Sequence, residues 1–323
     1  MIRQSTMVQV AAGITMIMFV VGLVNGIFSL VTFLNKEPRK IGCGIYLLAS
    51  SITSLLTIGM FTIKFWSVLL IEMYAPVSSF IIRMDCSFFG PALKLFLYLD
   101  GWLNACVAIE RTFNVSKGVN FNQQMSQRMA RWIILILPIL IIGTIIHEPI
   151  QQEVFKYSIP RIKNAKEMNE PLEYETINQS LCITRYSHSL QGYNTFTLFF
   201  HLIIPFVVNL CSALFIIFGS ARRRSAADKK QTYKQHILDQ ISEHKQLLIS
   251  PLVLLVLAFP RLIIGLVPGC IDPSSNPWLY LSAYFISFIP PIAIFVVFVL
   301  PSELYTKIFK ESIAKYRCRR QNY

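Results

Sequence analysis

The segment "ACVAIERTFNV", Ala105 to Val115, poses the main question of this sequence, because an almost unbroken apolar run ends there in an adjacent glutamate and arginine. Such a pair can anchor a helix at the edge of a membrane, with the arginine reaching toward water. It can equally belong to a conformational switch at that edge. From the position of Glu110 and Arg111 alone, both interpretations stand.

The composition indicates a membrane protein. Of the 323 residues, 54% are hydrophobic and 15% are charged, whereas soluble domains usually carry about 25% charged residues. An α-helix needs about 20 apolar residues to cross the hydrocarbon core. Seven apolar runs approach or exceed this length, at residues 8–34, 43–70, 88–113, 132–146, 195–220, 247–267 and 278–300. We therefore expect an all-α membrane protein, a seven-transmembrane helix bundle that forms one domain over residues 1–323.

Lysine and arginine in short loops predict which side of a membrane protein faces the cytoplasm. They are concentrated after the first, third and fifth runs and in the C-terminal segment. These parts, including a third inner loop at 221–246 and the segment 302–323, are expected to be cytoplasmic. Residues 1–7 and a long second outer loop, 148–192, are expected to be extracellular, in a plasma-membrane protein. The net charge of +13 follows from this asymmetry, and nucleic-acid binding is not expected because the basic residues lie in separate loops.

Sequons and cysteines agree with this orientation. Asn178, in "NQS", falls on the predicted outer side and is the expected glycosylation site, whereas Asn114, in "NVS", falls inside. The seven cysteines lack the spacing of metal ligands, so no metal site is expected. Cys86 and Cys182 lie on the oxidising side between polar residues and are the expected disulfide. Cys270 is a third candidate, and unpaired thiols remain the alternative.

Several motifs resemble those of the rhodopsin-like G-protein-coupled receptors, across nearly the whole chain. "IERTF" is similar to the family's Glu/Asp-Arg-Tyr motif at the inner end of the third helix, and Arg111 follows Cys86 by 25 residues, the separation that the family keeps. Further matches are Asn25 in "GLVNGIF", "LA" at residues 48–49, Pro205, Pro260 in "LAFPRL", and Pro291 in "IPPIAIF". The three prolines are the expected helix bends.

The chain also departs from the family pattern, as a divergent member. The second run has Ile52 where the family has an aspartate, and the sixth has Ala258 where the family has a tryptophan. The seventh run lacks the family's tyrosine. Details of activation therefore do not transfer from the resemblance.

The segment "LPSELYTKIFKESIAKYRCRR" resembles the family's short amphipathic C-terminal helix, which lies along the inner membrane face. Its own pattern agrees, because apolar residues recur at helical spacing with lysines among them; they are Leu304, Tyr305, Ile308, Phe309 and Ile313. Cys318 is a candidate for palmitoylation. A solvated amphipathic tail with an inert cysteine is the alternative.

The resemblance implies a switch and an ion site. In the family, the arginine equivalent to Arg111 is held by its acidic neighbour, here Glu110, and meets a heterotrimeric G protein when the sixth helix moves outward. Asp100 lies 11 residues earlier on nearly the same helix face, about 16 Å higher and close to mid-bilayer. We expect it to bind a sodium ion or a proton; the expected helpers are Asn104, Asn25 and Ser51. A neutral aspartic acid hydrogen-bonded in the core is the alternative.

The resemblance also places two cations, Lys94 and Arg261, toward a ligand cavity between the outer helix ends. Two cations in one cavity repel unless an anion bridges them, so we expect an acidic ligand. The expected polar walls of this cavity are His201, Tyr280 and Tyr284. The alternatives are that either cation reaches outward, or pairs with Glu72 or Asp272. Amine ligands and retinal are not expected, because Leu93 stands where amine receptors have an aspartate and residues 278–300 contain no lysine.

The sequence thus favours a receptor that couples an extracellular ligand, a peptide or a small acid, to a heterotrimeric G protein. A transporter or channel is the alternative class, although it would usually show an internal repeat. An enzyme is not expected, because the five histidines are dispersed and neither HExxH nor GxSxG occurs. No cofactor is expected apart from the sodium ion.

Overall fold

The computed structural model describes residues 2–72, 79–162, 174–184, 186–227, 256, 282, 285–286 and 288–321. Within this part of the chain, five helices are long and apolar enough to cross a membrane: Val8–Phe33, Gly42–Ser67, Ser87–Lys117, Gln123–Gln151 and His188–Gly219. They coincide with the first five predicted runs, and the prediction of a helical membrane protein is confirmed. The sixth run lies outside the described residues except for Val256, and the seventh is described only in part.

The spans belong to long helices that alternate with short elements. The helices are α1 (Ile2–Phe33), α2 (Gly42–Glu72), α3 (Ser79–Met84), α4 (Gly90–Lys117), α5 (Gln123–Ile145), α6 (His147–Gln151), α7 (His188–Ala227), α11 (Ile289–Ile292) and α12 (Glu303–Gln321). Single 3-10 turns, η1 (Pro38–Lys40) and η3 (Gly118–Asn120), connect helices at one end of the bundle. Short π-helical segments, η2 (Asp85–Phe89) and η4 (Phe295–Val299), precede α4 and α12.

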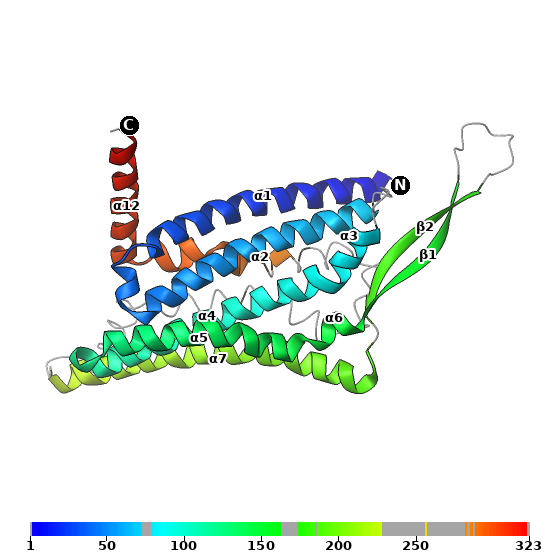
Figure 1. The fold of residues 1–323 in the computed structure, drawn as a ribbon. Helices are drawn as coiled ribbons and strands as arrows, with labels where there is room; N and C mark the ends of the chain where they lie inside the picture. The colour runs from blue at the N-terminus through cyan, green and yellow to red at the C-terminus, as the bar shows by residue number, and fades with distance from the viewer. Residues whose placement is uncertain are drawn as a thin grey trace.

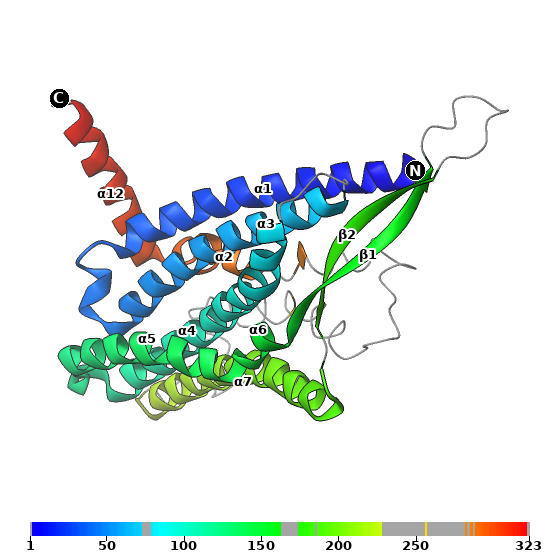
Figure 2. The same ribbon diagram turned by 45° about the vertical axis from the view of Figure 1, so that its right-hand side comes forward.

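The five long helices lie side by side, and α4 is central among them (Figure 1). It packs against α2, α5 and α7, while α1 packs against α2. The N-terminus lies at one end of the bundle together with α3 and α6. This end is called the hairpin end, after the two paired strands described next. At the opposite end, called the α12 end, α12 points away across the direction of the other helices (Figure 2).

Residues 148–192 depart from the all-α prediction. They contain two antiparallel strands, β1 (Gln152–Ile162) and β2 (Tyr174–Thr184), paired from Gln152↔Thr184 to Ile162↔Tyr174. The strands project from the bundle at its hairpin end (Figures 1 and 2). Polar residues alternate with aromatic and β-branched ones in "VFKYSI", a period of two that favours a strand.

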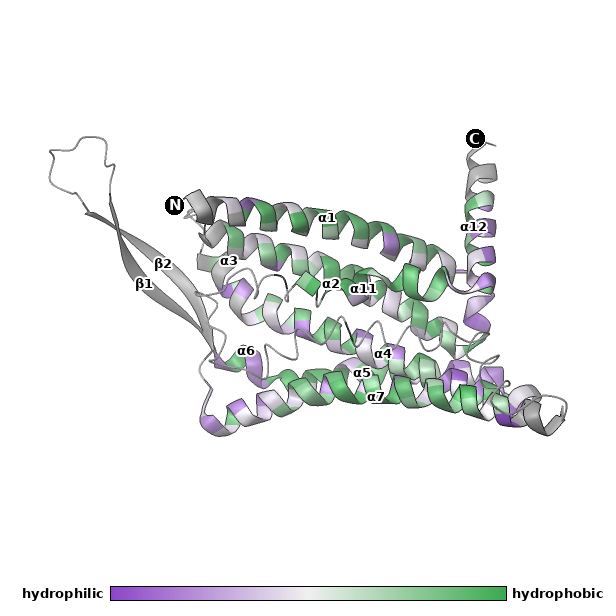
Figure 3. Ribbon diagram, turned by 180° about the vertical axis from the view of Figure 1, so that it is seen from behind, coloured by the Kyte–Doolittle hydropathy of each residue, from purple (hydrophilic) through white to green (hydrophobic). Residues whose placement is uncertain are grey.

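The outer surface of the bundle is apolar, as a lipid environment requires. Figure 3 shows hydrophobic residues along the long helices and a mixture of both kinds on α12. On α5, Leu135 is 64% exposed and Ile139 is 69% exposed. Exposed apolar side chains of this size and number would be costly in water, whereas hydrocarbon accommodates them.

Glycines allow the helices to approach closely. A Cβ atom at Gly26 of α1 would lie 2.4 Å from a methyl carbon of Leu55 in α2, and one at Gly22 would lie 2.8 Å from Ile58. The spacing Gly-x-x-x-Gly thus serves packing within this chain. At the α12 end, a Cβ at Gly44 would lie 1.9 Å from the backbone oxygen of Pro38, which cannot move without shifting η1.

Two glycines of α2 provide a matched test of this packing. Gly59→Ala introduces a Cβ with nothing within 4 Å, so it should keep or slightly raise stability, since alanine favours helix. Gly44→Ala should lower the free energy of unfolding by roughly 1 to 3 kcal/mol, the usual cost of overpacking. Thermal unfolding of the purified variants measures both. Equal stability of the two variants would contradict the close contact with η1.

Candidate functional site

Glu110 is held at the N-terminus of α2 and by α5. It is 8% exposed, and the Ser126 hydroxyl donates to its Oε1 atom. The backbone N–H of Gly42 in turn donates to the Ser126 oxygen at 3.0 Å. Free N–H groups at a helix start stabilise a carboxylate. A side chain at position 42 would collide with Glu110, because a Cβ there would lie 2.6 Å from its Oε2 atom.

Arg111 turns toward other partners. Its guanidinium interacts with the Cys43 thiol of α2 and the Tyr305 hydroxyl of α12. The structure has three ion pairs among the described residues, and none joins Glu110 to Arg111. Arg111 also acts electrostatically on the adjacent Glu110 carboxylate, and the expectation that Glu110 holds Arg111 stays a prediction. Both members of the pair thus have a neighbour on α2, while Glu110 also contacts α5 and Arg111 also interacts with α12.

The apolar face of α12 packs onto the bundle beside this pair. Ile308 is buried, and the Phe309 ring lies 5.2 Å from that of Phe28 in α1 and 4.9 Å from that of Phe295 in η4. Ser312 accepts a hydrogen bond of 2.7 Å from the amide of Asn35. The predicted C-terminal helix is thus fixed to the α12 end by its first three turns.

Asp100 lies in the middle of α4 and is 4% exposed. The Ser50 hydroxyl of α2 donates to its Oδ1 at 2.5 Å, and the Asn104 amide lies 3.4 Å from its Oδ2. Two other predicted helpers are engaged within their own helices, since Asn25 donates to Val21 and Ser51 donates to Leu47. Ser50, which the sequence analysis did not single out, makes the contact with Asp100 that was expected of Ser51.

Lys94, one of the two cations predicted for the ligand cavity, already has a counterion. Lys94 Nζ lies 2.5 Å from Oε1 of Glu148, whose side chain is 3% exposed, and Lys64 lies 2.6 Å from Asp85 of η2. Burial, together with the nearby Glu148, raises the pKa of Tyr186 to about 12, so this phenol stays neutral. The sequence suggested Glu72 or Asp272 as partners for Lys94 or Arg261. It missed Glu148, which follows the fourth apolar run directly.

His201 forms a link between three helices. The Trp102 indole of α4 donates to its Nδ1 at 2.9 Å, so the proton of the neutral ring sits on Nε2. Nε2 then donates to the Thr144 hydroxyl of α5 at 2.8 Å, and Tyr98 stacks on the ring at 4.6 Å. Both ring nitrogens are used inside the bundle. His201 therefore has no nitrogen left for a ligand in this arrangement.

The remaining predicted residues are described only in part. Arg261, Tyr280, Tyr284 and Pro260 lie outside the described residues. Cys86 falls in η2 and Cys182 and Asn178 fall in β2, but their side chains, like that of Cys318 in α12, are outside the description. Pro205 lies inside α7, and Pro291 lies in α11.

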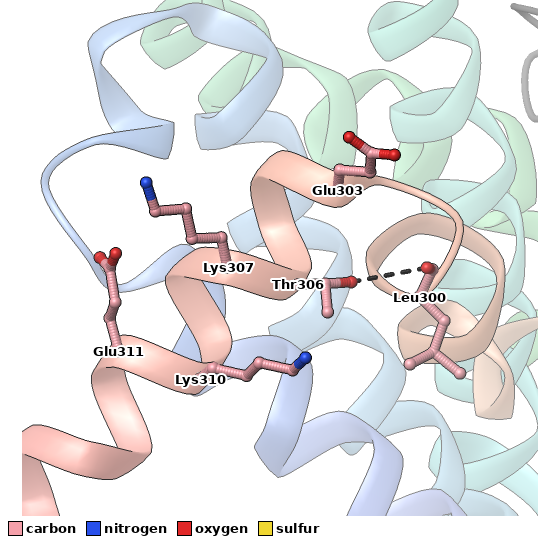
Figure 4. Close-up of a pocket in the computed structure, with 6 residues that line it drawn as sticks. All are labelled: Leu300, Glu303, Thr306, Lys307, Lys310 and Glu311. Carbon is pink, nitrogen blue, oxygen red and sulfur yellow. Dashed lines mark hydrogen bonds between the residues drawn. The ribbon is translucent and has the colours of Figure 1, made fainter.

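An open pocket of about 410 Å³ lies at the start of α12. It is lined by Leu300, Glu303, Thr306, Lys307, Lys310 and Glu311, and Figure 4 shows these side chains pointing in different directions. The lining combines two carboxylates with two ammonium groups, so it does not favour a ligand of either charge. It shares no residue with the predicted ligand cavity. No group of three or more metal-ligating side chains occurs in the described part of the chain.

The fold and these sites define a helical membrane protein with polar side chains buried at several levels of α4. A scan against models of known protein families gives no match to this chain. A search of curated proteins gives none either.

The Lys94–Glu148 pair can be tested by separating its members. Glu148→Gln leaves the ammonium of Lys94 without a counterion and should lower the free energy of unfolding by about 1 to 3 kcal/mol. This loss is smaller than for a fully buried pair, because the Lys94 side chain is 33% exposed. Lys94→Met together with Glu148→Gln should recover much of that loss. Thermal unfolding of the four proteins of this cycle measures the coupling, and additive effects would contradict the pair.

Proposed function

We propose that this protein is a divergent rhodopsin-like G-protein-coupled receptor of the plasma membrane. The proposed molecule has seven spans, with the hairpin end outside and the α12 end in the cytoplasm. A Cys86–Cys182 disulfide, glycosylation at Asn178 and palmitoylation at Cys318 belong to the same proposal. The observation that carries it is the position of Arg111, which lies in the last two turns of the spanning helix α4, at the α12 end, and interacts there with groups of α2 and α12.

The charge distribution supports this orientation. Arg39, Lys117 and Arg128, none of which is in an ion pair among the described residues, lie in or beside the connections at the α12 end. The hairpin end instead carries the two ion pairs Lys64–Asp85 and Lys94–Glu148, in which positive charge is balanced. Positive loops favour the cytoplasmic side. A heterotrimeric G protein would then meet the face that contains Arg111.

For the ligand, we favour a peptide over a small acid. The argument for an acid needs two cations without counterions, and Lys94 already has the buried carboxylate of Glu148. Arg261 alone carries that argument, so the acid is the weaker choice. The hairpin adds a surface at the same end, which suits a ligand larger than a single small molecule.

Guanine-nucleotide exchange tests the receptor directly. Membranes containing the protein would be assayed on a panel of G proteins with a library of peptides and small acids. Arg111→Ala should reduce stimulated exchange about tenfold to hundredfold, the effect of losing charged hydrogen bonds. Arg128→Ala removes an exposed cation at the same end and should change it less than about threefold.

Absence of exchange from a well-folded protein across the whole panel would count against a receptor. The same result would direct attention to transport, for which flux across reconstituted vesicles is the measurement. Equal losses in Arg111→Ala and Arg128→Ala would show a general charge effect at this face in place of a switch.

Asp100 is proposed to hold a sodium ion or a proton. An ion that binds only the folded state raises the unfolding temperature with concentration. Sodium chloride should therefore stabilise the wild type by a few degrees relative to N-methylglucamine chloride of equal ionic strength. Asp100→Asn should abolish the difference, Ser50→Ala should reduce it, and Ser51→Ala, whose hydroxyl bonds within its own helix, should leave it intact. No sodium effect in the wild type would favour a hydrogen-bonded neutral aspartic acid.

A further inference from the structure

The spanning helix α7 has a weak turn at residues 201–205. Pro205 lies inside this helix and has no backbone N–H, so the carbonyl of His201, one turn earlier, cannot receive its usual helical hydrogen bond. Sharp bends in helices occur mostly at such turns. The turn also lies against α4, because a Cβ atom at Gly101 would be 3.9 Å from the His201 carbonyl oxygen and 3.9 Å from Cβ of Pro205. It is therefore the place where α7 can change direction against α4.

The side chain at this weak turn is attached to two other helices. His201 is 4% exposed. Its Nδ1 accepts the Trp102 indole N–H of α4 at 2.9 Å, and its Nε2 donates to the Thr144 hydroxyl of α5 at 2.8 Å. Tyr98 of α4 stacks on the ring, with centroids 4.6 Å apart and planes 12° apart. The residue that loses a helical hydrogen bond to Pro205 is thus the one whose side chain joins α7 to α4 and α5.

The two hydrogen bonds of His201 depend on one another. An indole N–H can only donate, so Nδ1 must carry the lone pair and Nε2 the proton. The Thr144 hydroxyl, which accepts this proton, donates in turn to the Ile141 carbonyl of its own helix at 2.7 Å. The chain of donors therefore runs in one direction, from α4 through α7 to α5. Such buried networks are stable only while every member has a partner, so the loss of one bond weakens the whole link.

We propose that His201 is a positioning residue that holds the Pro205 turn of α7 against α4 and α5, and that α7 bends at this turn when the link breaks. The restraint is a property of the fold, and only its consequence rests on the proposed function. In the proposed receptor, the part of α7 after Pro205 leads to the third inner loop. A peptide at the hairpin end that displaces Tyr98, one turn from Lys94 on α4, loosens the ring of His201.

Amide hydrogen exchange along α7 tests the restraint in the purified full-length protein, without any G protein. His201→Phe keeps a ring for Tyr98 to stack on and removes both hydrogen bonds. It should speed exchange at residues 201–209 about tenfold to hundredfold, while α1 and α2 change less than about twofold. Trp102→Phe and Thr144→Val each remove one bond and should speed exchange there about threefold to tenfold.

Pro205→Ala shows whether the weak turn is what His201 restrains. This change gives the His201 carbonyl its helical N–H donor again. In the Pro205→Ala background, His201→Phe should speed exchange less than about threefold. The matched control is Thr195→Val, which removes a hydroxyl of α7 that bonds to Gln191 of the same helix at 3.0 Å, and it should change exchange less than about twofold.

Two results overturn the proposal. If His201→Phe leaves exchange at residues 201–209 unchanged, its hydrogen bonds do not hold the turn. If it speeds exchange equally in all helices, or equally with and without Pro205, His201 contributes only to overall stability.

Ligand-independent nucleotide exchange separates this proposal from the proposed function. His201→Phe should raise it several-fold, because the bend of α7 is then released without a ligand. If α7 loosens as expected while no variant supports nucleotide exchange, the positioning role stands and the receptor proposal fails.

Discussion

The membrane interior provides no water for polar groups, so the polar side chains that α4 carries into it need partners within the protein, and several find them on other helices. Lys94 finds a carboxylate of α6, and Asp100 finds a hydroxyl of α2. Trp102 donates to the histidine of α7. Glu110 is held by α2 and α5, and Arg111 by α2 and α12. The requirement to satisfy these groups fixes how the other helices are arranged around α4.

The strength of these contacts differs along the bundle. At the hairpin end the charges are paired with opposite charges, which are costly to separate in a low dielectric. At the α12 end, Arg111 interacts with a thiol, a phenol and the adjacent Glu110 among the described residues, and the glutamate is stabilised by a serine and a helix start. The contacts of Glu110 and Arg111 thus lie at the end of the bundle that carries the positive loops.

Much of this architecture could be predicted from the sequence, because lipid exposure requires long apolar runs. Five runs coincide with described helices, and the placement of Asp100 and Arg111 on one face of a helix follows from helical periodicity. Periodicity along one helix does not give the rotation of its neighbour, however. Adjacent serines such as Ser50 and Ser51 could not be told apart until α2 was oriented against α4.

The features that the sequence did not predict involve contacts between distant segments. Glu148 reaches Lys94 only because α6 follows α5 at the hairpin end, and Tyr305 comes near Arg111 only because α12 docks by its apolar face. The β1–β2 hairpin was missed for a different reason: its alternating pattern lies within a charged loop, which a search for long apolar runs passes over.

The central claim is that the end of the bundle carrying Arg111 faces the cytoplasm. Its most direct test is an epitope inserted in the chain between β1 and β2, called the hairpin epitope, compared with one placed after Tyr323. Antibody should bind the hairpin epitope on intact cells and the C-terminal epitope only after permeabilisation. The opposite result would put Arg111 outside the cell, where no G protein could reach it, and would contradict the account.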